Sequence, residues 1–207
     1  MVDLEKKLIE MSRFENDLYE KGIEKICGID EVGRGPLAGP VVACSIILPR
    51  DFKILGIDDS KKLSEKKRND LYEKITSTCL AFGIGVVDNY IIDEINILNA
   101  TKLAMKLAIE NMGILPDHLL IDAVKLENVK ISMTSIIKGD SLSVSIAAAS
   151  IVAKVTRDRM MQDFHLEYPH YAFDANKGYG TKAHYSGIDE FGICKIHRKS
   201  FLKAYFP

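Results

Sequence analysis

Residues 26–48 of the chain read ICGIDEVGRGPLAGPVVACSIIL, and this stretch decides the fold. Residues 26–29 form a short apolar run that leads directly into Asp30 and Glu31, which predicts a strand that ends at two acids. Residues 41–48 are β-branched and apolar between two prolines, which is typical of a buried strand. The glycines and prolines between the two runs predict a turn, so the stretch indicates two strands joined by a Gly-rich connection.

Outward from this stretch, hydrophobic periodicity predicts alternating helices and strands. An amphipathic first helix, closed by Gly22, is indicated by apolar residues at steps of four and three: Leu4, Leu8, Met11, Phe14 and Leu18. Further helices are expected over residues 64–75, 91–112 and 142–166, and further strands over residues 80–87, 119–121 and 131–137. Residues 50–63 form a polar loop, and only loops and short helices are expected after Pro169. This order predicts a mixed α/β sheet with helices on both sides.

No internal repeat or linker divides the chain, so we expect one domain over residues 1–207, with residues 168–207 as a small appendage. The last long helix carries a run of alanines, Ala147 to Ala149 with Ala153, which favours close packing of that helix.

Composition excludes several classes of protein. The chain has 207 residues, 47% hydrophobic and 28% charged, which is enough for one domain with a buried core. Lys and Arg number 28 against 29 for Asp and Glu, which excludes a histone-like, purely electrostatic binder. The four cysteines include no C-x-x-C pair, so neither a zinc knuckle nor a disulfide framework is indicated. With no apolar run of about 18 residues and no signal peptide, we expect a cytoplasmic protein without a membrane segment.

Charge is unevenly distributed along the chain. Residues 1–31 hold nine acids and five bases, whereas residues 175–207 hold six bases and two acids. The basic end can form a local patch that faces phosphates, but a solvated surface tail would give the same pattern. Charge alone leaves both interpretations open.

Acidic residues follow the apolar runs at three places: Asp30 with Glu31, Asp122, and Asp140. Sheet proteins gather side chains from several strand ends into one crevice, so acids that lie far apart in sequence can meet there. Carboxylates in one crevice repel one another unless cations neutralise them. Hard oxygen ligands suit Mg²⁺ or Mn²⁺, and two such ions about 3.5–4 Å apart can activate a water and stabilise the leaving oxygen of a phosphodiester.

Each acid also has an ordinary structural interpretation. Asp140 precedes a helix and can be its N-cap, and Asp122 can form a turn at a strand end. Neighbouring residues of a regular strand point to opposite faces, so Asp30 and Glu31 share a site only if the strand ends or bulges there. The spacing by itself decides neither way.

The turn over residues 33–38 formally matches G-x-G-x-x-A, but a dinucleotide site needs a helix to begin there. Pro36 and Pro40 prevent a helix from beginning at this turn, and a strand is expected to follow instead. No G-x-x-x-x-G-K-[ST] loop is present in the sequence. What remains is a turn whose glycines let the backbone approach a ligand closely, beside an arginine and two acids. A tight strand connection is the structural alternative.

Beyond these single features, a series of motifs closely resembles the bacterial ribonuclease HII family. In the family's order, the matching stretches are residues 28–40 (GIDEVGRGPLAGP), 59–64 (DSKKLS), 139–140 (GD), 145–151 (SIAAASI), 154–158 (KVTRD), 178–181 (GYGT) and 197–201 (HRKSF). They cover nearly the whole chain, and the first is long and specific.

The resemblance implies a ribonuclease H-like fold with a small helical C-terminal part. It also implies a divalent-metal endonuclease that cuts the RNA strand of RNA–DNA hybrids and cuts 5′ of single ribonucleotides in duplex DNA, leaving a 3′-hydroxyl and a 5′-phosphate. Carried over by position, the residues that would hold two Mg²⁺ or Mn²⁺ ions and catalyse the reaction are Asp30, Glu31, Asp122 and Asp140.

The resemblance also assigns substrate contacts. Gly33, Arg34 and Gly35 match the turn that contacts the ribonucleotide through its 2′-hydroxyl, the group that distinguishes RNA from DNA. Tyr179 matches the aromatic residue at the ribonucleotide–deoxyribonucleotide junction, although a Tyr in a Gly-bounded turn is also an ordinary half-buried residue. Lys61 matches a phosphate contact less closely.

The sequence departs from the family pattern at Leu142, where many members carry a lysine two residues after the acid that matches Asp140. Residues 1–22 carry none of the motifs, no sliding-clamp-binding tail is recognised in residues 202–207, and no protein partner is indicated. None of the five histidines is assigned to catalysis: His184 is interpreted as an incidental surface residue, and His197 as structural or phosphate-facing.

Three rival functions remain on the residues alone. The first is another nuclease with the same metal fold, such as a resolvase or a DNA exonuclease, which would need activity on all-deoxyribose substrates. The second is a non-catalytic nucleic-acid-binding module, which loss of an acid would indicate, yet all four are present. A two-carboxylate glycosidase is more distant, because such sites usually add aromatic sugar platforms and this chain has no Trp.

Overall fold

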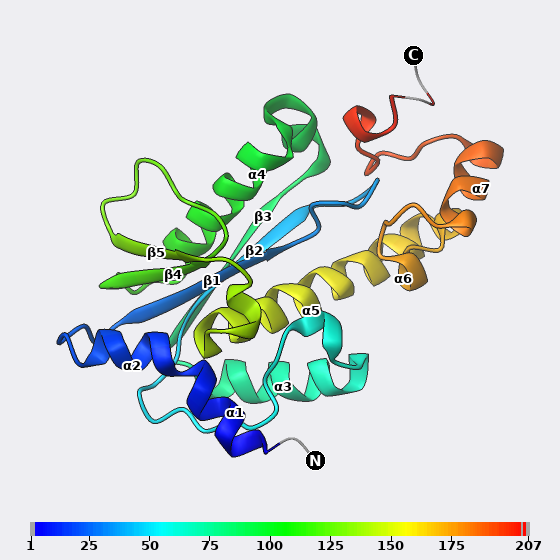
Figure 1. Cartoon of the computed structure of the whole chain (residues 1–207). Coiled ribbons are helices and arrows are strands. Elements are labelled where there is room, and N and C mark those ends of the chain that lie inside the picture. The colour runs from blue at the N-terminus through cyan, green and yellow to red at the C-terminus, as the bar shows by residue number, and fades with distance from the viewer. Residues whose placement is uncertain (1–2, 204, 206–207) are drawn as a thin grey trace.

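The computed structural model describes residues 3–203 and 205. Within this range, five strands form one mixed sheet in the order β3-β2-β1-β4-β5. The strands are β1 (Ile26–Val32), β2 (Val41–Ile47), β3 (Ala81–Val87), β4 (His118–Asp122) and β5 (Ser132–Ile136). β1 runs antiparallel to β2 and parallel to β4, while β2 and β3 are antiparallel and β4 and β5 parallel. The mixed α/β sheet expected from the sequence is confirmed (Figure 1).

The helices are α1 (Leu4–Met11), α2 (Arg13–Tyr19), α3 (Glu65–Thr78), α4 (Asn89–Asn111), α5 (Val144–Glu167), α6 (Phe173–Asn176) and α7 (Lys182–Phe191). Short 3-10 turns are η1 (Ser60–Lys62), η2 (Gly139–Ser141), η3 (Pro169–Tyr171) and η4 (Lys199–Phe201). The expected appendage after residue 168 consists of such short elements. It lies beyond the end of α5, to the right in Figure 1.

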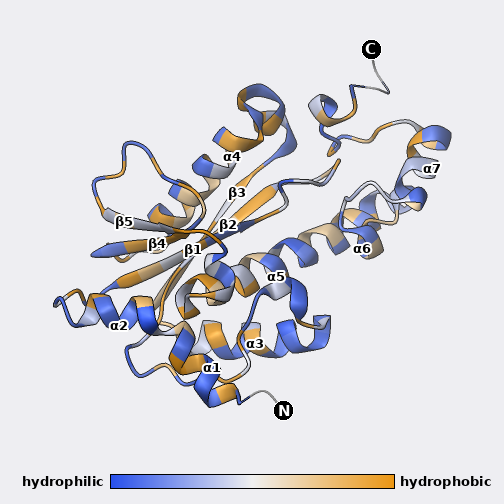
Figure 2. Cartoon of the chain, in the orientation of Figure 1, coloured by the Kyte–Doolittle hydropathy of each residue, from blue (hydrophilic) through white to orange (hydrophobic). Residues whose placement is uncertain are grey.

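Helices cover both faces of the sheet. α4 packs on the face formed by β1, β2 and β3, and α5 packs on the opposite face with α3 beside it (Figure 1). The alanines of α5 are fully buried, as their small size predicts. A Cβ added at Gly28 would lie only 2.1 Å from the Ser145 carbonyl carbon, so β1 and α5 meet backbone to backbone. Figure 2 shows hydrophobic residues along the central strands, between these two helical layers.

Two of the expected helices differ from the structure. The predicted first helix is two helices, because the Ser12 hydroxyl donates to the Leu8 carbonyl (2.8 Å) where the chain bends. The predicted helix over residues 91–112 begins at Asn89 and is bent at Asn96, which has φ 67°. The Asn96 side chain accepts hydrogen bonds from the N–H groups of Leu98 and Asn99, so it caps the second part of the helix.

The C-terminal appendage packs in a hydrophobic cluster that includes Phe173, Ile188 and Leu202 and also Ala38 and Met161 from outside it. It is tied to the sheet by the first half of α4, since Asp93 accepts hydrogen bonds from the N–H groups of Lys199 and Ser200. The segment 202–207, in which no clamp-binding tail is recognised, lies partly outside the described residues.

Candidate active site

Parallel pairing of β1 and β4 brings Asp30 and Asp122 to the same end of the sheet, at the carboxyl ends of the paired segments, which we call the acidic edge. The last paired residues of β1 and β4 are Ile29 and Ile121, and an acid follows each of them. Asp122 accepts a hydrogen bond from the N–H of Gly139 (2.7 Å), the residue before Asp140. The turn that carries Asp140 is therefore fastened to Asp122, and acids from three separate segments meet at this edge.

The strand predicted to end at Asp30 and Glu31 continues past them, and a site shared by the two acids stays a prediction. β1 continues through Val32 and stays paired to β2, with Asp30 opposite Cys44 and Glu31 opposite Ala43. Pairing to β4, in contrast, ends at Ile29, so one side of β1 is free beside both acids. Both also lie close enough to Asp122 for its charge to raise their pKa values.

Burial and mutual repulsion shape the electrostatics of the acids. Burial raises the pKa of Asp30 well above its usual value, and the charges of Glu31 and Asp122 raise it further. Burial also raises the pKa of Glu31, although the Arg34 guanidinium works against this. For Asp140, burial raises the pKa, and Asp59 and Asp122 add to the rise. The protein therefore concentrates negative charge here without fully compensating it.

The alternative role of Asp140 as the cap of α5 is not what the structure shows. Ser143 is the N-cap, and its hydroxyl accepts a hydrogen bond from the N–H of Ile146 (3.2 Å). Asp140 lies instead inside the preceding 3-10 turn. Leu142, the departure from the family pattern, is 45% exposed and lines a surface hollow with residues of α1 and α2.

Lys61 lies near the acids, close enough for their charges to act on it. Burial lowers its pKa, but the charges of Asp140, Asp59 and Asp30 raise it more, so the net shift is upward. Its turn is held against α5 by a hydrogen bond between the Ser60 and Ser150 hydroxyls (2.9 Å). Lys61 is thus a cation beside the acidic edge, and its contact with a phosphate stays a prediction.

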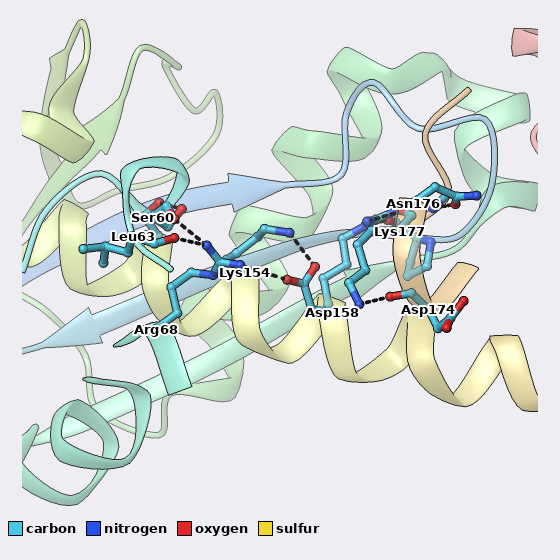
Figure 3. A network of polar contacts seen from close by, with 12 residues as sticks. Ser60, Leu63, Arg68, Lys154, Asp158, Asp174, Asn176 and Lys177 are labelled. Atoms are coloured by element: carbon cyan, nitrogen blue, oxygen red, sulfur yellow. Dashed lines mark hydrogen bonds and ion pairs between the residues drawn. The ribbon is translucent and has the colours of Figure 1, made fainter. Parts of the chain in front are cut away.

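A polar network supports this turn from below (Figure 3). Arg68 of α3 donates to the carbonyl oxygens of Ser60 (3.1 Å) and Leu63. Asp158 of α5 pairs with Lys154 and lies 3.9 Å from Arg68. The network joins α3, α5 and the Lys61 turn, so the position of Lys61 depends on buried contacts rather than on a free loop.

The Gly33–Gly35 turn and Tyr179 lie together, next to the acids. Arg34 Nη1 is 3.4 Å from Glu31 Oε1, and a Cβ added at Gly35 would lie 3.5 Å from Cε1 of Tyr179. The N–H of Leu37 donates to the Gly178 carbonyl (2.8 Å), which binds the two turns to each other. Tyr179 is 45% exposed, so its ring is available at the surface.

Sequence reasoning misplaced His184, whereas His197, interpreted as structural or phosphate-facing, is buried and structural. His184 is not a surface residue but fully buried, and its Nε2 lies 2.9 Å from Nε2 of the equally buried His197. The Tyr179 carbonyl can only accept a proton, so His184 Nδ1, 3.0 Å away, carries one. The N–H of Cys194 donates to His197 Nδ1 (2.9 Å). The chain of bonds therefore fixes both rings as neutral and anchors the backbone of Tyr179.

No residue spacing in the sequence indicated this pair, because its members meet only when α7 and the segment after it fold back together. The matched GYGT and HRKSF stretches, which contain or flank these histidines, were the available signal.

The donor set at the acidic edge fits a hard divalent cation. Every candidate ligand is a carboxylate oxygen, and Glu31 Oε2 is buried without a hydrogen-bond partner. The side chains do not already converge on one point, since among residues 3–203 and 205 no three His, Cys, Asp or Glu side chains are placed to hold one ion between them. Mutual repulsion keeps like charges apart, and a cation is the group that would lower that repulsion.

The mixed sheet and its order of strands define a ribonuclease H-like fold. The ribonuclease H2 of Pyrococcus horikoshii OT3 shares this fold, with a TM-score of 0.71 at 24% identity over 85% of this chain and 93% of that one. A structure described as Bst-RNase HIII in complex with Mn²⁺ gives a TM-score of 0.59 at 20% identity, over 86% of this chain and 64% of that one.

Sequence similarity identifies the family. The family model described as ribonuclease HII matches residues 27–204. The ribonuclease HII of Listeria innocua is 56% identical over 195 residues, which cover 94% of this chain and 74% of that protein. The chain belongs to the ribonuclease HII family.

Family membership gives the chain its reaction class. It is a ribonuclease H, an endonuclease that hydrolyses phosphodiester bonds, and its family acts on RNA–DNA hybrids with the help of a divalent metal ion. No helix in the described part of the chain is long and apolar enough to cross a membrane.

Proposed function

We propose that this enzyme cuts the RNA strand of RNA–DNA hybrids and also cuts duplex DNA on the 5′ side of a single embedded ribonucleotide. Asp30, Glu31, Asp122 and Asp140 would hold two ions, Mg²⁺ or Mn²⁺. Such ions supply an activated water and stabilise the leaving oxygen. The products are a 3′-hydroxyl and a 5′-phosphate, and the 2′-hydroxyl of the ribonucleotide is recognised without acting as the nucleophile.

The acids support this role by their electrostatics. Burial and like charges raise the pKa values of Asp30, Glu31 and Asp140, so a bound cation removes an unfavourable interaction that the protein's own groups leave in place. Lys61 and Arg34 lie beside the acids and can contact phosphate oxygens of a bound substrate.

The single observation that carries the proposal is the position of the glycine turn. It contacts both the acids and the Tyr179 ring, since Arg34 lies against Glu31 and Gly35 faces Tyr179. A 2′-hydroxyl that meets this turn is therefore beside the reacting phosphate, and the next sugar or base can stack on Tyr179.

The appendage, residues 168–207, supports binding of a nucleic-acid backbone. Lys182, Lys195, Lys199 and Lys203 are exposed and can contact phosphates without sequence preference. Arg198, which contributes to the basic count of this segment, is fully buried and is not part of such a surface.

The test uses an end-labelled DNA duplex with one ribonucleotide, beside an all-DNA duplex and a long RNA–DNA hybrid. With Mg²⁺ or Mn²⁺ we expect one cut 5′ of the ribonucleotide, cleavage of the hybrid, an intact all-DNA duplex, and no cleavage in EDTA. Cleavage of the hybrid alone would contradict the junction role of Tyr179. Cleavage of the all-DNA duplex would contradict recognition of the 2′-hydroxyl.

A further inference from the structure

Two arginines, Arg157 and Arg198, are fully buried beneath the glycine turn. A buried guanidinium normally has a carboxylate partner. In the described part of the chain, however, no carboxylate oxygen lies within 4 Å of a nitrogen of either one; all their nitrogens donate to backbone carbonyls. Arg198 binds the carbonyl oxygens of Gly33 (2.6 Å), Arg34 (3.1 Å) and Gly39 (2.9 Å).

Arg157 binds a different set of carbonyls. Its nitrogens donate to Ala38 (3.2 Å), Pro40 (2.9 Å) and Lys177 (2.8 Å), so it joins the far end of the turn to the segment that leads into Tyr179. Only Arg198 reaches the two carbonyls at the tip of the turn. The two arginines therefore have separable effects on the same loop.

The peptide geometry determines where the N–H groups at the tip point. In a planar trans peptide, the C=O and the N–H point in opposite directions. Because Arg198 holds the carbonyls of Gly33 and Arg34 from inside, the N–H groups of Arg34 and Gly35 point outward. Both residues are exposed, and within the described chain neither N–H donates a hydrogen bond.

These two donors lie at the junction of the site. Arg34 lies against Glu31, and Gly35 faces the Tyr179 ring, whose Cε1 would be 3.5 Å from a Cβ added there. Two adjacent N–H groups that point to solvent match an oxygen acceptor rather than a donor, and a hydroxyl oxygen is such an acceptor.

We propose that Arg198 is a positioning residue for substrate specificity: by binding the carbonyls of Gly33 and Arg34, it holds the N–H groups of Arg34 and Gly35 ready for the 2′-hydroxyl oxygen of a ribonucleotide. This inference rests on the proposed function. Arg157 stabilises the loop as a whole, but the direction of the two N–H groups depends on Arg198.

The test compares Arg198→Lys with Arg157→Lys and with Arg159→Lys, an exposed arginine of α5 that pairs with Glu73. Lysine keeps the charge but cannot bind three carbonyls in a fixed fork. Binding is measured with Ca²⁺ in place of the reaction metal, on a duplex with one ribonucleotide and on its all-DNA counterpart. The quantity compared is the dissociation constant for the all-DNA duplex divided by that for the ribonucleotide duplex.

We expect Arg198→Lys to reduce that ratio about tenfold, the equivalent of one to two hydrogen bonds, while affinity for all-DNA duplex stays unchanged. Arg157→Lys should reduce it less and Arg159→Lys not at all. An unchanged ratio in Arg198→Lys, or an equal loss of affinity for both duplexes, would overturn the inference.

A second measurement needs no variant and so does not depend on whether Arg198→Lys folds. In ¹⁵N-labelled wild-type protein, the amide resonances of Arg34 and Gly35 should move downfield with the ribonucleotide duplex and not with the all-DNA duplex. Identical spectra with both duplexes would refute the role of these donors. If the wild-type enzyme cuts at the ribonucleotide while the amides do not respond, the proposed function stands and only this inference fails.

Discussion

Two regions of this molecule bury charges of opposite sign, and they differ in how far those charges have hydrogen-bond partners. At the edge of the sheet, burial and the charge of Asp122 raise the pKa values of Asp30 and Glu31, and Glu31 Oε2 has no hydrogen-bond partner. Beneath the glycine turn, every nitrogen of Arg157 and Arg198 donates to a carbonyl. The acidic region leaves part of its negative charge unpaired, whereas every guanidinium nitrogen of the two arginines has a hydrogen-bond acceptor.

The difference assigns the two regions to different purposes: the arginines stabilise the fold, and the acids serve the reaction. Burial lowers the pKa of Arg198 to about 9 and that of Arg157 to about 10, so both guanidiniums stay charged at neutral pH and keep all their donors. They hold the recognition turn from within. The carboxylates make some contacts within the chain, such as the hydrogen bond that Asp122 accepts from the N–H of Gly139, but their remaining charge is available to a cation from outside.

The largest expected effect comes from the acidic edge. Asp30→Asn should lower kcat on a single-ribonucleotide substrate by about a thousandfold or more, because it removes a charged ligand for the metal ion. The same change should raise the melting temperature, because it removes a buried charge that repels Glu31 and Asp122. Kinetics and thermal unfolding of the same preparation check both parts.

Wild-type activity in Asp30→Asn would refute the metal role of this acid. A large fall in melting temperature would instead show that the acidic edge contributes to stability, and the contrast between the two regions would disappear. Asp70→Asn, an exposed acid of α3, serves as the control and should change neither quantity.

Replacement of the buried Arg198 is expected to lower the melting temperature, whereas Asp30→Asn should raise it. Like Asp30→Asn, Arg198→Met removes a buried charge. Unlike that change, it leaves the carbonyls of Gly33, Arg34 and Gly39 without a hydrogen-bond donor. We expect a loss of about 3 kcal/mol, or about 6–12 °C in melting temperature for a chain of this length. Thermal unfolding beside Asp30→Asn tests the contrast directly, and a rise in both variants would break it.

Acid sensitivity is expected from the histidine pair of the appendage. Burial lowers the pKa of His197 to about 4 and also lowers that of His184, whereas the unfolded chain has values near 6.5. Between those values the unfolded state binds more protons, so the pair's contribution is present above about pH 6.5 and is lost as the pH falls toward 4.

His197→Gln cannot take up that proton. The difference in melting temperature between wild type and His197→Gln should therefore shrink between pH 7 and pH 4.5, by the equivalent of up to about 3 kcal/mol. A difference that stays constant over this range would contradict the neutral pair. Because the comparison is between two proteins at each pH, titration of the acids affects both alike.

The sequence was sufficient to predict the parts of the molecule that follow from local pattern. Acids that follow apolar runs suggested that strand ends could gather Asp30, Glu31, Asp122 and Asp140 in one crevice, although the spacing decided neither way, and the fold brings these acids near one another. The family resemblance added the glycine turn and Tyr179. Their metal and substrate contacts stay predictions, but their proximity is now a fact of the fold.

The parts that could not be predicted depend on contacts between distant segments. Arg198 was counted with the bases of the C-terminal segment and Arg157 stood only within a matched motif, because nothing local indicates that carbonyls of residues 33–40 surround Arg198 or that carbonyls of Ala38 and Pro40 contact Arg157. His184 and His197 pair only after the appendage folds. The bends at Ser12 and Asn96 arise from side chains that compete with helical hydrogen bonds, a balance that apolar periodicity does not report.

The smallest expected effect concerns Tyr179, where the two regions meet. Its backbone carbonyl is held by His184, so Tyr179→Ala removes the ring without releasing the turn. Loss of one stacking contact should lower kcat/KM about tenfold on a single-ribonucleotide duplex. On a long RNA–DNA hybrid the loss should be about twofold, because many ribonucleotides can occupy the site. Tyr179→Phe, which keeps the ring, should behave as wild type on both substrates.

Tyr90→Ala provides the matched control, since Tyr90 is an exposed tyrosine (61%) of α4 outside the turn. Equal losses on both substrates for Tyr179→Ala would mean that the ring contributes general affinity rather than junction recognition. A larger loss on the single-ribonucleotide duplex would mean that two separate contacts share the recognition of the substrate. The backbone donors held by Arg198 would then recognise the 2′-hydroxyl, and Tyr179 would recognise the step to deoxyribose, with the acids acting on whichever phosphate those two contacts present.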